Sequence, residues 1–289
     1  MPHDSAEPPF IRTGPEEPSS PVVLSVPHAG RAYSPALLTA SRLPLQKLES
    51  LEDRLVDRLV WRAVQAGATA LIALAPRAEI DLNRDEREMD PSLVAPPLAA
   101  GKLLQSARTR GGLGLVPSRI GGSGAIWFNR IASAELDRRV DSIHRPYHAA
   151  LADMLARTRR RFGVAVLLDC HSMPARTGGA RKEPEIVFGD RYGTSIAPDY
   201  FNAAIAAAEA QGFTTARNHP YAGGHITARH GRPGAGIHAL QIEIDRAAYL
   251  APDMRSPGPG FDRTARMIAA VAEAIAARIA DAPAAIAAE

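Results

Sequence analysis

The sequence predicts an α/β fold, in which one domain is built on a central, mixed but mostly parallel sheet flanked by helices. Residues 164–168 read V-A-V-L-L and then stop at Asp169-Cys170-His171. An unbroken aliphatic run of this kind is typical of a strand buried on both faces of a sheet. Val22–Val26 has the same character and runs into His28. Strand and helix patterns alternate along the rest of the chain, which favours parallel central strands.

The first part of the chain supplies an arm, a strand, a helix and a second strand. Residues 1–20 are rich in Pro, Glu and Ser without an apolar period, which predicts a mobile N-terminal arm. The strand ending at Val26 follows. Apolar residues then recur with a 3.6-residue period from Leu48 to Ala66, which predicts an amphipathic helix that ends at Gly67. Ala68–Ala75 is the next buried strand.

The middle of the chain is predicted to be a long loop followed by a long helix. Residues 85–134 are heavy in Pro and Gly, and a connection of this length is usually functional, often a lid. Gly121–Gly124 lacks the lysine and the strand-to-helix context of a phosphate-binding loop. The helix is expected from Ala134 to about Phe162, interrupted near Pro146.

The last part of the chain completes the sheet and closes the domain. The expected elements are a strand at Glu185–Phe188, a helix at Asp199–Gln211, an edge strand at Phe213–Ala216, a loop at Asn218–Gly236, a strand at His238–Ile244 and a helix at Phe261–Ala280. The domain is therefore expected to span residues 21–283, and residues 284–289 to fray.

Composition excludes several classes of protein. The 289 residues are 46% hydrophobic and 22% charged, as in ordinary globular proteins, and no apolar run approaches the roughly 18 residues of a membrane span. The single Cys170 and the lack of a signal-peptide pattern favour a cytoplasmic location. The net charge of +3 comes almost wholly from arginine, without a motif for nucleic-acid binding. The sequence does not determine the oligomeric state, and a homo-oligomer is one of the possibilities.

Two histidines at strand ends suggest a metal site. His28 and His171 follow equivalent buried strands, and the carboxyl ends of parallel strands form one ligand-binding edge. Catalytic zinc sites use three His or carboxylate ligands and keep one position open. Candidates for the third ligand are Glu52, Asp53 and Asp57; Asp53 is preferred to Asp57 because it is nearer to the loop that carries His28. Asp57, four residues further along the expected helix, would orient a ligand or pair with Arg54 or Arg58.

Other chemical groups flank this pair. Asp169 lies two residues before His171, on the same face of the strand, and can hold its ring. Cys170 should point away from the site, since neighbours on a strand face opposite sides. Glu243 is a carboxylate near the end of the alternating strand His238–Ile244. His144 and His148 are four residues apart but lack the acid of a known metal motif, so His148 is expected to pack or to line the cleft.

The successive motifs of the chain resemble those of the N-formylglutamate amidohydrolase family. They are V-P-H-A-G (26–30), V-D-R-L (56–59), D-L-N-R (81–84), D-C-H-S (169–172), P-Y-A-G-G (220–224) and Q-I-E-I (241–244). They span residues 22–250 in the family's order. The resemblance implies a zinc-exopeptidase-like fold, related to zinc carboxypeptidases and aspartoacylases.

The resemblance also implies roles for individual residues. His28, Asp53 and His171 would hold one Zn²⁺ per chain, with Asp57 and Asp169 around them, and Glu243 would be the base. Asn83 and Arg84 would bind a substrate carboxylate. A cation from Arg77 or Arg119 would stabilise the developing oxyanion, and Tyr221 and His225 would contact the substrate.

The implied reaction is hydrolysis of an N-formyl or N-acyl amino acid, N-formyl-L-glutamate in the first instance, to formate and L-glutamate. The sequence departs from the family pattern at Leu51–Leu55, where an acid-x-acid-aromatic-His segment is expected, and at His225, where an aromatic residue is expected. Two alternatives therefore stay open: a broader N-acyl amino acid or peptide amidase, and a non-catalytic binding protein that has lost its metal.

Overall fold

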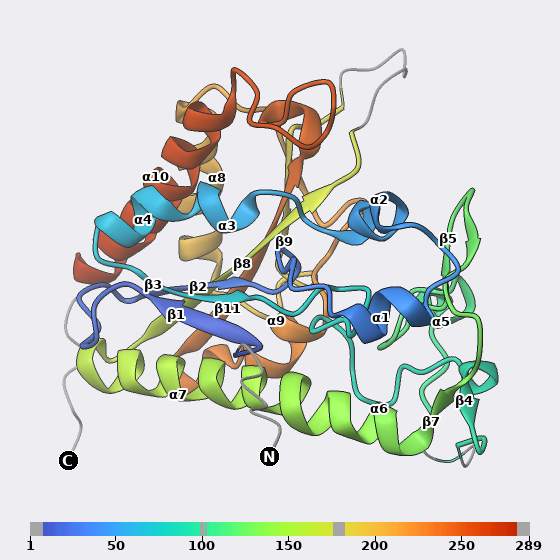
Figure 1. The fold of residues 1–289 in the computed structure, drawn as a ribbon. Helices are drawn as coiled ribbons and strands as arrows, with labels where there is room; N and C mark the ends of the chain where they lie inside the picture. Colours follow the sequence, from blue (N-terminus) through green and yellow to red (C-terminus); the bar gives the residue numbers. More distant parts are fainter. Residues whose placement is uncertain (1–7, 99–100, 102, 176–182, 282–289) are drawn as a thin grey trace.

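A seven-stranded mixed sheet forms the centre of the molecule (Figure 1). The computed structural model describes residues 8–98, 101, 103–175 and 183–281. The strands lie in the order β1-β3-β2-β8-β11-β9-β10. Their bounds are β1 Phe10–Thr13, β2 Val22–Val26, β3 Thr69–Ala73, β8 Ala165–Met173, β9 Ile186–Gly189, β10 Thr215–Arg217 and β11 Ile237–Asp245. The α/β fold with a mixed, mostly parallel sheet is confirmed.

The four central strands, β3, β2, β8 and β11, run parallel, and their register places polar side chains together at one edge of the sheet. β2 pairs with β3 and with β8, and β8 pairs in parallel with β11. In this register Glu243 of β11 lies opposite His171 of β8. β2 ends two residues before His28. His28 therefore lies at the same edge of the sheet as His171 and Glu243.

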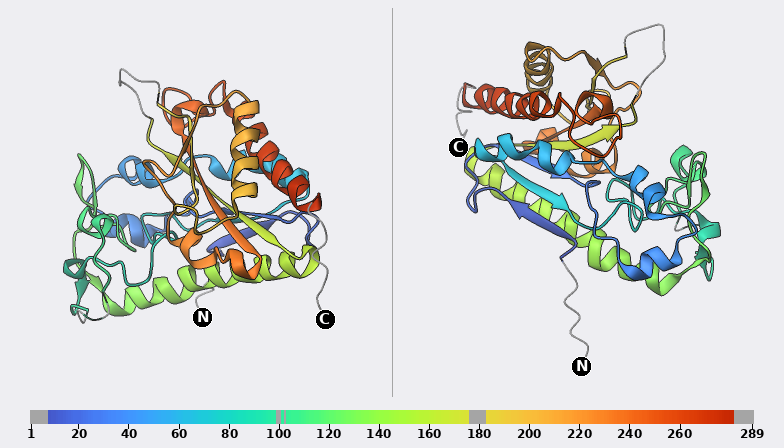
Figure 2. Two further views of the ribbon diagram at one scale, coloured as in Figure 1. Left: turned by 180° about the vertical axis from the view of Figure 1, so that it is seen from behind. Right: turned by 45° about the horizontal axis from the view of Figure 1, so that its top comes forward.

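Helices cover both faces of the sheet (Figures 1 and 2). One face is covered by α10, which packs on α8, α4 and α3, and the other by α7. Their bounds are α3 Val56–Leu59, α4 Trp61–Gln65, α7 Arg145–Phe162, α8 Pro198–Ala210 and α10 Phe261–Ala280. α6 (Ser133–Arg139) continues into α7 through a π-helical turn at Val140–His144. This turn lies just before Pro146, where an interruption was predicted.

Short elements make up the remainder. They are the helices α1 Pro35–Ala40, α2 Leu45–Leu48, α5 Ala107–Arg110 and α9 His225–His230, the one-turn 3-10 helices Glu49–Leu51, Pro91–Leu93, Pro233–Ala235 and Arg246–Ala248, and the two-residue strands β4 Val94–Ala95, β5 Arg119–Ile120, β6 Gly124–Ala125 and β7 Ile131–Ala132. As predicted, most of the stretch 85–134 is loop. Within the described residues, no helix is both long and apolar enough to cross a membrane.

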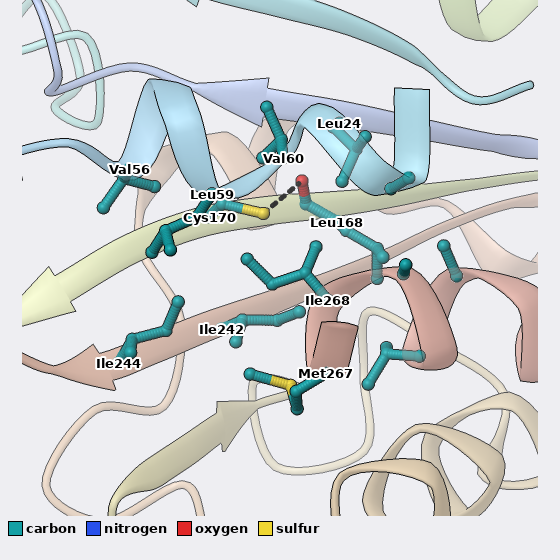
Figure 3. Close-up of a cluster of buried hydrophobic side chains, with 14 of the residues drawn as sticks. Leu24, Val56, Leu59, Val60, Leu168, Cys170, Ile242, Ile244, Met267 and Ile268 are labelled. Carbon is teal, nitrogen blue, oxygen red and sulfur yellow. Dashed lines mark hydrogen bonds between the residues drawn. The ribbon is translucent and has the colours of Figure 1, made fainter. Parts of the chain in front are cut away.

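Cys170 lies in the hydrophobic core and not in the site (Figure 3). Its side chain is fully buried among aliphatic residues of β11 and α3, including Ile242 and Leu59. Burial raises the pKa of the thiol well above its ordinary value. The prediction that Cys170 points away from the crevice is confirmed, because alternation along β8 sends its neighbours His171 and Asp169 to the opposite face.

The mobile arm predicted for residues 1–20 is wrong for part of that stretch. Phe10–Thr13 forms β1, which pairs antiparallel with β3 at the edge of the sheet. Phe10 packs edge-on against Tyr147 of α7, with ring centroids 5.7 Å apart. Four residues are too few to show an apolar period, so pairing with β3 determines this strand. Residues 1–7 and 282–289, which include the frayed tail predicted at 284–289, lie outside the described residues.

The single helix predicted from Leu48 to Ala66 is also wrong. The chain leaves the helical path at Glu52 and resumes it at Val56, with Leu55 in the left-handed region at φ 61°. The backbone N–H of Asp53 donates to the carbonyl of His28, 2.9 Å away, instead of to a helical partner. Tertiary contacts thus override the apolar period here.

Candidate active site

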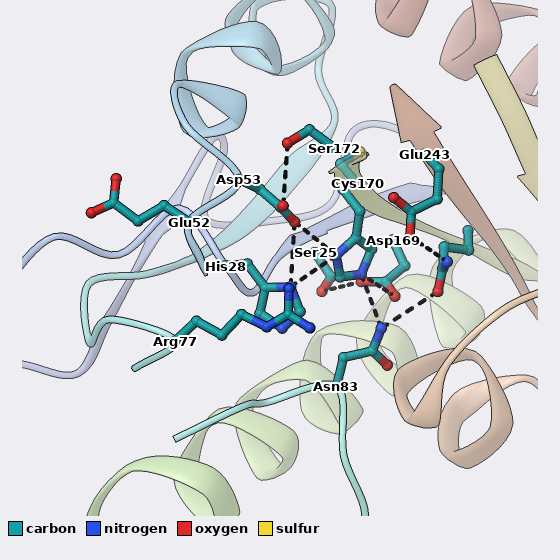
Figure 4. A network of polar contacts seen from close by, with 12 residues as sticks. Ser25, His28, Glu52, Asp53, Arg77, Asn83, Asp169, Cys170, Ser172 and Glu243 are labelled. Atoms are coloured by element: carbon teal, nitrogen blue, oxygen red, sulfur yellow. Dashed lines mark hydrogen bonds and ion pairs between the residues drawn. The ribbon is translucent and has the colours of Figure 1, made fainter. Parts of the chain in front are cut away.

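Three buried side chains meet at the carboxyl edge of the sheet (Figure 4). Nδ1 of His171 lies 3.1 Å from Nδ1 of His28 and 3.0 Å from Oδ2 of Asp53. The third side of this triangle, from His28 Nδ1 to Asp53 Oδ2, is 3.3 Å. His28 follows β2, His171 belongs to β8, and Asp53 comes from the non-helical turn before α3. We call His28, Asp53 and His171 the ligand triangle.

The outer nitrogens of both histidines face buried carboxylates. His28 Nε2 lies 2.7 Å from Asp81, and His171 Nε2 lies 2.9 Å from Asp169. Because a carboxylate accepts, each Nε2 donates its proton, and a neutral ring then directs the lone pair of Nδ1 into the triangle. Metal-bound histidines are held by carboxylates in this way. Asp169 therefore orients His171, as predicted.

The triangle fits a divalent metal ion such as zinc. Ligand atoms at about 2.0–2.1 Å from a tetrahedral zinc lie about 3.3 Å from one another. The three observed separations, 3.0 to 3.3 Å, are close to that value. With both rings neutral, two nitrogen lone pairs and a carboxylate oxygen converge on one buried point, and a cation there would relieve their mutual repulsion. Two imidazoles and one carboxylate also match the donor set of hydrolytic zinc sites.

Asp81 is the residue that organises the arginines around the triangle. Besides His28, it accepts from Nε of Arg77 at 2.9 Å and from the backbone N–H of Asn83 at 2.9 Å. Arg84 lies 3.7 Å away. Burial raises the pKa of this carboxyl, but Arg77, Arg84 and His28 outweigh burial and hold the pKa well below its usual range. Asp81 is therefore a permanent anion.

Glu243 stands beside the triangle, held by a chain of amides. Its Oε1 accepts from Nε2 of Gln241 at 2.8 Å, and the Gln241 oxygen lies 3.4 Å from Nδ2 of Asn83. Asn83 is oriented in turn by the backbone N–H of Ile226, which donates to its Oδ1 at 2.8 Å. Burial raises the pKa of Glu243 to about 7. A carboxyl with a pKa near neutrality is suited to general base catalysis.

A pocket of about 320 Å³ opens over these groups. Its wall includes the ligand triangle, Glu243 and four arginines. The arginines are Arg77, Arg84, Arg108 and Arg246. Arg246 donates to Ser172 Oγ and lies 3.4 Å from Asp53. The pocket is therefore positively charged around an acidic centre, as expected of a site for an anionic ligand.

Most residues that the sequence predicted for the site do line this pocket. They are His28, Asp53, Arg77, Asn83, Arg84, His171, Tyr221 and Glu243. Of the three acids left open as the third ligand, only Asp53 reaches the histidines. Glu52 is turned away and pairs with Arg54 and Tyr33.

Three predicted site residues lie elsewhere. Asp57 pairs with Arg31, because the break at Leu55 removes the helical spacing that was expected to align it with Asp53. Arg119 is exposed on β5, where its guanidinium donates to the carbonyl of Arg110. His225 begins α9 and packs against His148 instead of lining the pocket.

Arg108 and Arg246 were missed by the sequence interpretation, and Asp81 and Gln241 were named only as parts of motifs. Gln241 carried a signal, because it alternates with Glu243 on one face of its strand. Arg108 and Arg246 carried none, since many arginines occupy similar loop and helix-end positions in this sequence.

Comparisons with known proteins agree with this arrangement. The model of the N-formylglutamate amidohydrolase family matches residues 20–250. A deformylase of N-formylglutamate from Pseudomonas putida is 32% identical over 239 residues, which cover 80% of this chain and 82% of the relative. The corresponding protein of Pseudomonas aeruginosa is 29% identical over 237 residues, with the same coverage.

A solved structure carries the same family name. The crystal structure of N-formylglutamate amidohydrolase from Ralstonia eutropha superposes with a TM-score of 0.86 at 32% identity, covering 94% of this chain and 98% of that one. A gene product of Agrobacterium tumefaciens, 18% identical with a TM-score of 0.64, shares the fold. The resemblance of the sequence motifs is thus confirmed: the chain belongs to the N-formylglutamate amidohydrolase family.

Proposed function

We propose that this chain is a metal-dependent amidohydrolase that converts N-formyl-L-glutamate to formate and L-glutamate. The observation that carries the proposal is the ligand triangle, with Glu243 beside it, at the base of an arginine-lined pocket. The curated relatives named as deformylases of N-formylglutamate support the same substrate.

His28, Asp53 and His171 would hold one divalent ion, which we propose to be Zn²⁺. Three protein ligands leave a tetrahedral ion with a position open toward the pocket. When bound, the ion supplies Lewis acidity, which makes water a competent nucleophile at neutral pH and polarises the scissile carbonyl. The complete donor set argues against the alternative of a binding protein that has lost its metal.

Glu243 is proposed to move the protons. As a buried carboxylate at the pocket wall it can take a proton from the attacking water and pass it to the departing amine. Gln241 keeps the carboxylate in place through its hydrogen bond to Oε1. Arg77, fixed by Asp81, offers a cation for the negative charge that develops on the carbonyl oxygen.

The arginines of the pocket would recognise the substrate. N-formyl-L-glutamate carries two carboxylates at neutral pH, and guanidinium groups bind carboxylates in a planar, two-pronged geometry. Arg84 is buried and held by the carbonyls of Leu113 and Asn83, so it is a rigid donor. Arg108 and Arg246 line the same pocket. A monoanionic amide would leave part of this positive charge unpaired.

The substrate class can be tested directly with a panel of amides. We expect zinc-loaded protein to hydrolyse N-formyl-L-glutamate with a kcat/KM at least tenfold above that for N-formyl-L-leucine, because each charged hydrogen bond contributes about 1.5–3 kcal/mol. Formate and amino acid release would be measured, with N-acetyl and N-formimino-L-glutamate in parallel. Preference for the leucine compound would instead support the broader amidase.

Asp81→Asn tests whether the carboxylate behind His28 supports the metal site. An asparagine fills the same space without the charge, so we expect the affinity for zinc to fall about 10–100-fold, as for other outer partners of metal-bound histidines. The measurement is competition with a chelator. Asp57→Asn is the matched control, and an equal loss in both variants would contradict the geometry.

Glu243→Gln tests the proton carrier. We expect kcat to fall by about 10²–10⁴, the usual contribution of a general base, while the zinc content stays at the wild-type level. Glu209→Gln, an exposed acid on α8, serves as the control and should keep wild-type rates. Near-normal turnover in Glu243→Gln would place the base on another residue.

Arg108→Ala tests the pocket's cationic wall. Arg108 lines the pocket from α5, whereas Arg110 on the same helix does not. We expect KM for N-formyl-L-glutamate to rise about tenfold to a hundredfold in Arg108→Ala, through loss of one charged hydrogen bond, with little change for N-formyl-L-leucine. Arg110→Ala should match wild type. An equal rise for both substrates would contradict a role in carboxylate recognition.

A further inference from the structure

A second cluster of histidines lies apart from the ligand triangle. His144 closes the π-helical turn, His148 follows one turn later on α7, and His225 begins α9. Each ring offers a nitrogen that lies within 4.8 Å of the nitrogens offered by the other two. The ring centroids are 4.5 Å apart for His144 and His148 and 5.2 Å apart for His148 and His225. None of the three lines the active-site pocket.

Backbone carbonyls fix the tautomers of two of these rings. His144 Nε2 lies 2.9 Å from the carbonyl oxygen of Arg84, and His148 Nε2 lies 3.0 Å from that of Leu82. A carbonyl oxygen only accepts, so both Nε2 atoms donate, and each Nδ1 of a neutral ring carries a lone pair. Donation of the far N–H to a backbone carbonyl is the usual support of a metal-bound histidine.

Two of the inward nitrogens lack a hydrogen bond. Nδ1 of His144 and Nε2 of His225 are both buried and make no hydrogen bond within the described part of the chain. Nδ1 of His148 accepts from Nε2 of His230, 3.0 Å away. Buried polar atoms without a hydrogen bond are rare and cost free energy, so binding of a ligand to these two nitrogens would be favourable.

We propose that His144, His148 and His225 form a second metal site, which binds a transition ion of the zinc class. Imidazole nitrogens are the donors that suit Zn²⁺, Co²⁺, Ni²⁺ and Cu²⁺. An ion here would satisfy both unpaired nitrogens at once and would replace the hydrogen bond from His230 at His148. Burial lowers the pKa of all three imidazoles, that of His225 to about 4, which keeps their lone pairs free at neutral pH.

The surroundings give the ion access and some compensating charge. A surface pocket of about 470 Å³ is lined by His148, His230 and Glu86. A carboxylate oxygen of Glu86 lies 3.7 Å from Nδ1 of His144, close enough to offset part of the charge of a cation. The positive charges nearby include those of Arg145, which pairs with Glu86, and of Arg229 and Arg232.

The second site would act on the first through the segment Leu82–Arg84. His144 and His148 hold the carbonyls of Arg84 and Leu82, and Asn83 between them contacts His171 and Gln241. An ion that fixes the two imidazoles also fixes this segment. The proposed role is therefore positioning and stabilisation, with no direct contact to substrate, and it does not depend on the proposed reaction.

Metal content of a matched set of variants tests the proposal. Apo protein, prepared with a chelator, would be saturated with Zn²⁺ and desalted, and bound zinc per chain determined by mass spectrometry. We expect His225→Phe and His225→Gln to hold one equivalent less than wild type, which would hold two. His219→Phe, an exposed histidine outside the cluster, is the control and should equal wild type.

Two further readouts keep the test decisive. Co²⁺ absorption of His225→Phe should keep the bands of the ligand triangle, which also reports correct folding, and lose a second set. Zinc should raise the Tm of wild type more than that of His225→Phe. Identical zinc content in wild type and both His225 variants would overturn the proposal. A change from one equivalent to none would instead keep the second site and refute the metal at the ligand triangle.

Discussion

Convergence of two imidazoles and a carboxylate at one buried point is the constraint on which the active-site architecture depends. Asp53, Asp81 and Asp169 are at most 1% exposed, and Glu243 is 9% exposed. The three aspartates contact His28 or His171, and Glu243 lines the same pocket, so four buried acidic side chains lie close together. Burying unpaired charge of one sign is costly. Arg77, Arg84 and Arg246 offset part of it, and a divalent cation at the triangle would add to this compensation. The buried acids of the site therefore require positive charge close to them.

The sheet determines where that constraint is met. Parallel pairing of β2 with β8 and of β8 with β11 brings their carboxyl ends together, which is a general property of α/β sheets. Alternation along β8 then gives one face to Asp169 and His171 and the other to Cys170 and the core. Asp53 is supplied differently. The helix is broken at Leu55, and the backbone N–H of Asp53 donates to the carbonyl of His28. Strand geometry supplies two ligands, and a local break supplies the third.

This division explains how far the sequence could predict the structure. His28, His171, Asp169 and Glu243 were predictable because each sits on or beside a strand whose apolar pattern is unmistakable. Residues outside strands were harder, since their positions depend on tertiary contacts that leave no periodic signal. A regular helix would have aligned Asp57 with Asp53, and the break at Leu55 prevents it.

The same reasoning accounts for the misplaced loop residues. Arg119 and Arg108 both belong to the long segment 85–134, where composition cannot tell which guanidinium turns inward. His225 was expected in a loop, yet it begins α9, whose next residue, Ile226, orients Asn83 through its backbone N–H. That peptide group contributes to the site by position alone, so no side-chain motif can reveal it.

The segment Leu82–Arg84 lies between the two histidine clusters and makes hydrogen bonds on the side of each of them. Its carbonyls accept hydrogen bonds from His144 and His148, and the side-chain Oδ1 of Asn83 accepts from the backbone N–H of Ile226. The Asn83 N–H, in turn, donates to the carboxylate that holds His28. Because four bonds in different directions converge on three residues, the segment has little freedom to move alone. A displacement of α7 or α9 would therefore move the segment Leu82–Arg84 and, with it, the residues that hold the ligand triangle. The helices thus contribute to the geometry of the active site.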